Sequence, residues 1–85
     1  MLATVASVTS AGRIKRRVNE FGINTSVIQT PQSIAKDGCG YSLRFEDSAK
    51  QIILRAANEL GIRIRAFYTE SVTDGKRSYL KIDHS

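Results

Sequence analysis

A pentapeptide motif occurs twice in this chain, and the repeat constrains the fold more than any other feature. Asn19-Glu20-Phe21-Gly22-Ile23 recurs as Asn58-Glu59-Leu60-Gly61-Ile62. Each copy ends a stretch whose apolar residues have the i, i+3, i+4, i+7 spacing of an amphipathic helix. These residues are Ala11, Ile14, Val18 and Phe21 in the first stretch and Ala49, Ile52, Ile53, Ala56, Ala57 and Leu60 in the second, and we expect Ile14, Val18, Phe21, Ile53, Ala56 and Leu60 to be buried in the core. A strand-like run precedes each helical stretch, and another follows it. The sequence therefore predicts two strand–helix–strand units in tandem.

The ends of the expected helices carry signals that agree with this reading. Thr9 or Ser10 can cap the first helix, because a short polar side chain accepts hydrogen bonds from the free N–H groups of a first turn. Gly22 and Gly61 stand where a residue with a left-handed backbone ends a helix. We expect helices at 10–21 and 47–60, and strands at 2–8, 23–30, 40–45 and 62–71.

Two such units in tandem favour an α+β fold of the ferredoxin-like, split βαβ type. This βαββαβ arrangement has a four-stranded antiparallel sheet with both helices on one face. We expect this domain over residues 1–71. Residues 72–85 are expected to form a C-terminal hairpin strand or a loose polar tail, because Asp74-Gly75 is a hairpin-turn signal ahead of a strand-like run at 78–82.

Length, charge and cysteine content narrow the class of protein. With 85 residues the chain is one small domain, and 13 Lys and Arg against 8 Asp and Glu give a formal net charge of +5. That charge favours anionic partners. The single cysteine and the absence of a signal-peptide pattern or a long apolar run predict a cytoplasmic protein that does not enter a membrane. Because Cys39 and His84 are the only residues of their kinds, neither a disulfide nor a zinc site is expected, and no metal or cofactor is predicted.

Cys39 is the candidate functional residue, because it lies between Gly38 and Gly40 in the connection between the two halves. Glycine neighbours remove bulk and permit unusual backbone angles, which would expose the thiol. The alternative is a small buried apolar residue at the start of a strand. The split βαβ topology brings this connection to the N-terminus of the first helix, where the helix dipole and Arg13 would favour a thiolate and lower the pKa of the thiol.

Three short motifs in the middle of the chain resemble those of the selenium/sulfur carrier-like proteins. They are Thr30-Pro31-Gln32-Ser33-Ile34, Cys39-Gly40 and Leu43-Arg44-Phe45. The resemblance covers about residues 1 to 70, and the chain departs from it in a longer stretch before Cys39 and in a basic first helix. It implies that Cys39 carries sulfur or selenium as a persulfide or perselenide, and that the partners are donor and acceptor proteins. The chain would then be a carrier or binding protein more than an enzyme.

Other residues around this motif have both functional and structural readings. Arg44 is a candidate for holding an anionic sulfur or a partner carboxylate, and its alternative is a solvated strand residue. Ser33 and Thr30 are expected to form hydrogen bonds within the loop, which is a structural role.

Two rival functions remain open at this stage. The first is RNA binding on the open face of the sheet, where strand alternation would place basic and aromatic side chains: Arg44, Arg63, Arg65 and Phe67. The second is a non-catalytic interaction or regulatory domain, in which the open face pairs with a second copy and Cys39 is incidental.

Overall fold

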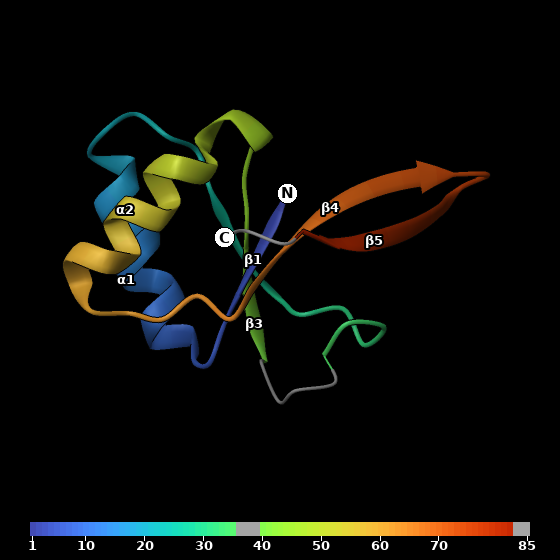
Figure 1. Ribbon diagram of the computed structural model, residues 1–85, viewed down its shortest axis with the longest axis horizontal. Helices are drawn as coiled ribbons and strands as arrows, with labels where there is room; N and C mark the ends of the chain where they lie inside the picture. Colours follow the sequence, from blue (N-terminus) through green and yellow to red (C-terminus); the bar gives the residue numbers. More distant parts are fainter. Residues whose placement is uncertain (36–39, 83–85) are drawn as a thin grey trace.

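The computed structural model describes residues 1–35 and 40–82 and shows a mixed α+β protein (Figure 1). A five-stranded sheet stands in the middle, with both helices on one side of it. In chain order the elements are β1 (Leu2–Val5), α1 (Val8–Asn19), β2 (Ser26–Gln29), β3 (Tyr41–Arg44), the short 3-10 turn η1 (Asp47–Ala49), α2 (Lys50–Leu60), β4 (Ala66–Thr73) and β5 (Lys76–Ile82).

The strand order confirms the ferredoxin-like split βαβ fold with an added C-terminal hairpin. The order is β2-β3-β1-β4-β5, and every neighbouring pair is antiparallel. Each strand–helix–strand unit thus leaves room for one strand of the other half between its own two strands. The first three observed strands are shorter than predicted, and β4 starts four residues later, because residues 62–65 form a connection outside any strand. The hairpin is longer than predicted, since β4 runs to Thr73 and β5 starts at Lys76.

The repeated motif ends both helices in the same way. Gly22 and Gly61 adopt left-handed backbones, with φ of 79° and 71°. The N–H of the isoleucine after each glycine donates to a carbonyl five residues earlier, Ile23 to Val18 at 3.2 Å and Ile62 to Ala57 at 2.8 Å. This pattern closes a helix by satisfying a carbonyl of its last turn. The predicted cap of α1 is wrong by two or three residues, because the cap is Ser7, whose side chain accepts from the N–H of Ser10 at 3.1 Å.

The hydrophobic core lies between the helices and the sheet. The helices contribute small and branched residues that the periodicity predicted, and the sheet contributes larger ones: Ala11, Ile14, Val18, Ile53, Ala56 and Ala57 from α1 and α2, and Val5, Leu43, Phe45 and Phe67 from the sheet side. Phe21, which the periodicity assigned to this core, is 57% exposed, because it lies beyond the last turn of α1. Arg17 covers its ring instead, with the guanidinium carbon 5.1 Å from the ring centroid.

The C-terminal segment forms the predicted hairpin strand. β4 and β5 pair over their whole lengths, from Phe67 opposite Ile82 to Thr73 opposite Lys76. Asp74 and Gly75 make the turn with φ of 53° and 76°, as a two-residue hairpin turn requires. The hairpin extends away from the helices as an arm (Figure 1). The expected domain boundary between residues 71 and 72 therefore falls inside β4.

Candidate functional site at the β2–β3 connection

The connection between β2 and β3 carries the predicted site, and the structure describes both of its ends. The first end is turned: the N–H groups of Ile34 and Ala35 donate to the carbonyls of Pro31 and Gln32 at 3.0 and 3.4 Å. Cys39 and Gly38 lie outside the described residues.

The two ends of the connection are tied to one end of the sheet. The N–H of Thr30 donates to the carbonyl of Gly40 at 3.0 Å. The hydroxyls of Thr30 and Ser42, both buried, are 2.7 Å apart and share a hydrogen bond. The threonine of the family-like motif thus bonds a side chain of β3, whereas a bond to the loop backbone was expected. These contacts hold the connection from both sides.

The same end of the sheet also carries the start of α1. Tyr41, the first residue of β3, is opposite Val5, the last residue of β1, and Ser7 then caps α1. Gly40 is therefore adjacent in the sheet to the strand that leads into the N-terminus of α1. For Gly40 this is the arrangement that the topology predicted.

Neither Gly40 nor Ser33 has a special structural role among the described residues. Gly40 is exposed, its φ is outside the left-handed region, and among the described residues other than its chain neighbours no atom lies within 4 Å of where a Cβ would stand. Its conformation is thus open to any residue. Ser33 is exposed, and its side chain makes no hydrogen bond within the part of the chain that the structure describes.

Arg13 lies farther along α1, on the side that faces the end of α2. It is exposed and lines a shallow hollow with Arg16, Arg17, Glu20 and Leu60. Arg17 bonds both nearby carboxylates, at 2.8 Å to Glu20 and 3.0 Å to Glu59. Hydrogen bonds to Glu59 first and to Glu20 second raise the pKa of the Arg17 guanidinium.

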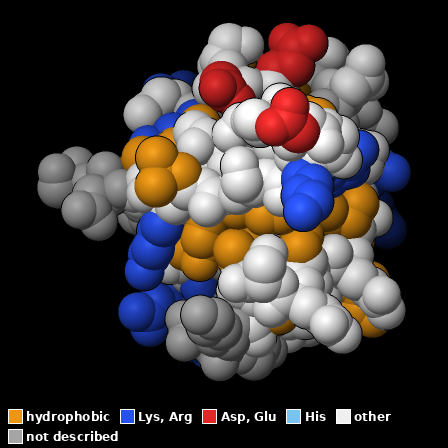
Figure 2. Space-filling view, turned by 90° about the vertical axis from the view of Figure 1, so that its right-hand side faces the viewer, with side chains coloured by type: hydrophobic (Ala, Val, Ile, Leu, Met, Phe, Trp, Pro, Cys, Tyr) orange, Lys and Arg blue, Asp and Glu red, His pale blue; other side chains and the backbone are white. Residues whose placement is uncertain are grey.

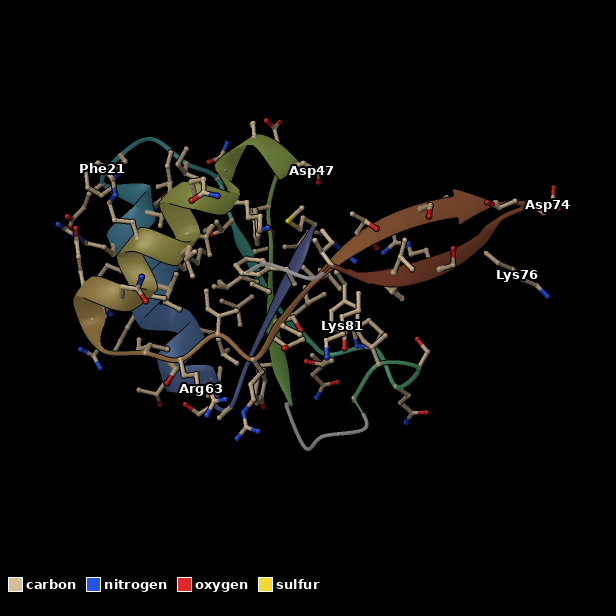
Figure 3. The ribbon with its side chains drawn as sticks, in the orientation of Figure 1. Phe21, Asp47, Arg63, Asp74, Lys76 and Lys81 are labelled. Atoms are coloured by element: carbon tan, nitrogen blue, oxygen red, sulfur yellow. The ribbon has the colours of Figure 1, made fainter. Side chains whose placement is uncertain are left out.

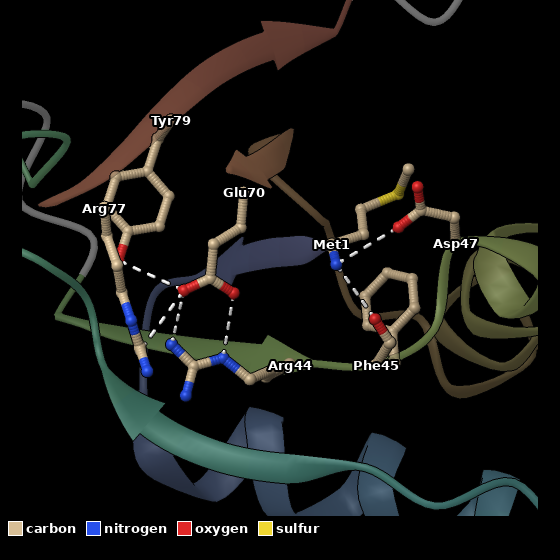
Figure 4. Close-up of polar contacts among 7 residues, drawn as sticks. All are labelled: Met1, Arg44, Phe45, Asp47, Glu70, Arg77 and Tyr79. Carbon is tan, nitrogen blue, oxygen red and sulfur yellow. Dashed lines mark hydrogen bonds and ion pairs between the residues drawn. The ribbon is translucent and has the colours of Figure 1, made fainter. Parts of the chain in front are cut away.

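Arg44 is at the far end of β3 from Gly40, and its guanidinium group is already paired with a carboxylate. Its Nε and Nη2 donate to the two oxygens of Glu70 at 3.2 and 2.8 Å (Figure 4). Arg77 and Tyr79 of β5 donate to the same carboxylate at 3.3 and 3.4 Å. The structure therefore does not bring Arg44 together with the cysteine connection. In the same view, the amino group of Met1 donates to the Phe45 carbonyl at 2.9 Å.

No local pattern in the sequence marks Glu70 as the partner of Arg44. Alternation along one strand shows which residues share its faces, but the register between strands decides which residues meet. β1 stands between β3 and β4, and Leu2 pairs with Arg44 on one side and Tyr68 on the other. Glu70 is two residues beyond Tyr68 on the same face, within reach of a long arginine side chain.

The face of the sheet away from the helices differs from the one that the RNA-binding reading required. Phe67 is fully buried on the helix side, where its ring meets Phe45 edge-on at 6.3 Å, so it offers no surface for base stacking. Arg63 and Arg65 precede β4 and are exposed in the connection from α2. The other face is itself buried at its centre, where Leu2 is 0% and Thr4 3% exposed.

The hairpin arm and the turn at 31–35 both lie on this second side of the sheet (Figure 1). Figure 2 looks onto this side and shows a band of hydrophobic side chains across it, with Lys and Arg beside the band and Asp and Glu along its upper edge. This side is thus a mixed surface and not an open basic one.

Two further observations limit the chemistry of the described residues. None of the helices that the structure describes is long and apolar enough to cross a membrane. Nor do three or more His, Cys, Asp or Glu residues gather anywhere in residues 1–35 and 40–82 in a way that could hold a metal ion.

The fold is that of a small ferredoxin-like protein, in which Gly40, the residue after the one cysteine in the sequence, directly precedes the strand β3 that pairs with β1 near the start of α1. A family model described as "Putative Se/S carrier protein-like" matches residues 1–69, and the chain belongs to this family. The family resemblance read from the Thr-Pro, Cys-Gly and Leu-Arg-Phe motifs is thereby confirmed. Searches among curated proteins and among solved structures found no match.

Proposed function

We propose that this protein carries sulfur or selenium on the thiol of Cys39 and passes it from a donor protein to an acceptor protein. The observation that carries the proposal is family membership over the span that contains the Cys39-Gly40 pair. The topology supports it, because Gly40 adjoins the strand that leads into the N-terminus of α1, an environment that favours an anion. A reducing compartment such as the cytoplasm would keep the thiol free.

The transfer chemistry balances without an external oxidant. The Cys39 thiolate attacks the terminal sulfur of a donor persulfide, R–S–SH, and forms a new S–S bond while the donor's S–S bond breaks. The donor leaves as the thiolate R–S⁻, and the terminal sulfur and its proton are now on Cys39. The acceptor's thiolate repeats the exchange and returns Cys39 to its thiolate form. A selenium atom in R–S–SeH follows the same course.

The experiment is a measurement of intact mass after the reduced protein has been treated with inorganic polysulfide and the excess removed. A carrier gains the mass of one or more sulfur atoms, loses it on treatment with dithiothreitol, and shows no gain as Cys39→Ser. Ser33→Ala is the matched control, because it removes a hydroxyl from the same connection and leaves the thiol in place. A mass gain that persists in Cys39→Ser, or no gain at all in the wild type, contradicts the proposal.

A thiol-to-thiol assay then distinguishes a carrier from a cysteine that merely oxidises. The loaded protein is mixed with a reduced small thiol-bearing protein, and the masses of both are followed. A carrier loses the sulfur atom as the acceptor gains one. Sulfur that stays on Cys39, or leaves only as free sulfide, would show that the chain does not hand it on.

A further inference from the structure

Cations that lack a partner among the described residues gather where α1 meets the end of α2 and the connection to β4. Arg13 and Arg16 line a hollow of about 160 Å³ with Leu60, the last residue of α2. Arg63 and Arg65 follow within five residues of Leu60 and are exposed. Figure 3 shows Arg63 beside the first turns of α1. We call these four residues, Arg13, Arg16, Arg63 and Arg65, the arginine surface.

The carboxylates nearest to this surface bond another residue. Glu20 and Glu59 both bond Arg17, so neither of them pairs with Arg13 or Arg16 within the described part of the chain. The other described acidic residues lie elsewhere: Glu46 and Asp47 in the β3–α2 connection, and Glu70 and Asp74 in the hairpin. Figure 3 shows Asp74 at the tip of the hairpin, far from Arg63 and close to Lys76.

The arginine surface is continuous with the end of the sheet that carries Gly40. The N–H of Arg65 donates to the carbonyl of Thr4 at 2.9 Å, and the next residue of β1, Val5, pairs with Tyr41 of β3. Two strand spacings of about 4.8 Å thus separate the backbone of Arg65 from that of Tyr41, which is about 10 Å in all. A protein that contacts Gly40 and the start of β3 also comes close to these arginines.

We propose that the arginine surface binds an acidic patch on the protein that gives the chalcogen to Cys39 or takes it away. This inference rests on the proposed carrier function and adds the charge of the partner and the place where it docks. All four cations are arginines, which are enriched in protein interfaces where lysine is depleted. Val8, at the start of α1, is 50% exposed and adds apolar area at the same end. Complementary charge would speed the encounter and orient the partner.

A nucleic acid is the less suitable occupant, because base recognition on single strands uses exposed aromatic side chains as stacking platforms. Phe67 is buried in the core, and exposed Phe21 lies past the C-terminal end of α1 under Arg17. Neither ring is available beside Arg63 and Arg65.

The test uses the full chain as Cys39→Ser, so that its outcome does not depend on thiol chemistry. A fluorescein-labelled octaglutamate peptide is the probe, and its binding is measured by fluorescence anisotropy at low and at physiological salt. The variant is Arg63→Glu with Arg65→Glu. The matched control is Lys76→Glu with Lys81→Glu, which makes the same change in net charge on exposed residues of β5. A second variant, Arg13→Glu with Arg16→Glu, covers the case in which the first does not fold.

The expected result is an affinity for octaglutamate that falls about tenfold in either arginine variant and less than twofold in the lysine control. Equal losses in the arginine and lysine variants would mean that only net charge matters, and would overturn the proposal. Tighter binding of an oligouridine of equal charge, lost with the arginines, would identify a nucleic-acid surface instead. Salt-dependent self-association that the arginine variants abolish would identify a second copy as the occupant. Because all arms lack the thiol, failure here leaves the polysulfide result on Cys39 intact.

Discussion

Gly40, which follows Cys39, has an ordinary backbone conformation, unlike the glycines that end the two helices. The sequence suggested that glycines around the cysteine permit unusual backbone angles. Gly40 uses no such angle, and the space around it is open, whereas Gly22 and Gly61 depend on positive φ to end the helices. Gly40 therefore differs from them in what a side chain would cost.

Replacing Gly40 by alanine should leave the fold intact or stabilise it slightly. An added Cβ restricts the backbone of the unfolded chain, and here it meets no obstacle in the folded one. The free energy of unfolding should therefore rise by about 0.4–1 kcal/mol. Gly61→Ala should instead lower the free energy of unfolding by about 1 kcal/mol, because its φ of 71° is strained for alanine. Urea unfolding of both variants measures this. Equal destabilisation by the two changes would mean that Gly40 has a conformational role.

At the scale of elements, the carboxylate of Glu70 joins β4 to two other strands. It accepts from Arg44 of β3 and from Arg77 and Tyr79 of β5, and its side chain is only 16% exposed. The hairpin is thereby connected to the body of the sheet through a side chain as well as through the ladder. Arg44, the arginine of the family-like Leu-Arg-Phe motif, is therefore already paired with Glu70 inside the protein.

Glu70→Gln should weaken this connection without changing the shape of the side chain. The amide loses the charge that two guanidinium groups share, and charge-assisted hydrogen bonds are roughly twice as strong as neutral ones. We expect a loss of about 1–2 kcal/mol in stability and faster amide exchange in β5, with α1 and α2 unaffected. Asp74→Asn, at the exposed hairpin turn, is the control for lost charge alone. Unchanged exchange rates in β5 of Glu70→Gln would show that the ladder alone holds the arm.

The helices could be predicted from the sequence, while contacts between strands could not. Apolar spacing and the two glycines identify α1 and α2 because both signals are local to one helix. Phe21 and Phe67 were assigned to the wrong environments for different reasons. The helix α1 ends two residues before the pattern of apolar residues does, and the face of β4 depends on its register against β1. The Arg44–Glu70 pair depends on that register too. Gly40 lies at the end of the sheet where α1 begins, which topology alone decides.

At the scale of the whole molecule, the hydrophobic core contributes more to stability than the hairpin arm does. Every buried residue of the core cluster lies between Ala3 and Phe67, and the family match ends at residue 69. From the arm, Ile82 packs against this core and is partly buried. The protein is thus a compact family domain with an arm that extends one edge of its sheet.

A chain that ends at Thr73 should therefore still fold and still load sulfur on Cys39. It loses the β4–β5 ladder, the packing of Ile82 and two of the donors to Glu70, but it keeps the Arg44–Glu70 pair and the whole core cluster. Partial burial of one isoleucine contributes about 1–2 kcal/mol, and each kcal/mol lowers the melting temperature of a small domain by about 4–8 °C. Thermal unfolding followed by circular dichroism, with polysulfide loading read by intact mass, measures both properties. Full-length Ile82→Ala isolates the packing of that side chain from the ladder. If the shortened chain is unfolded at room temperature while Ile82→Ala is not, the pairing of β5 is part of the folding unit, and residues 72–82 belong to the domain.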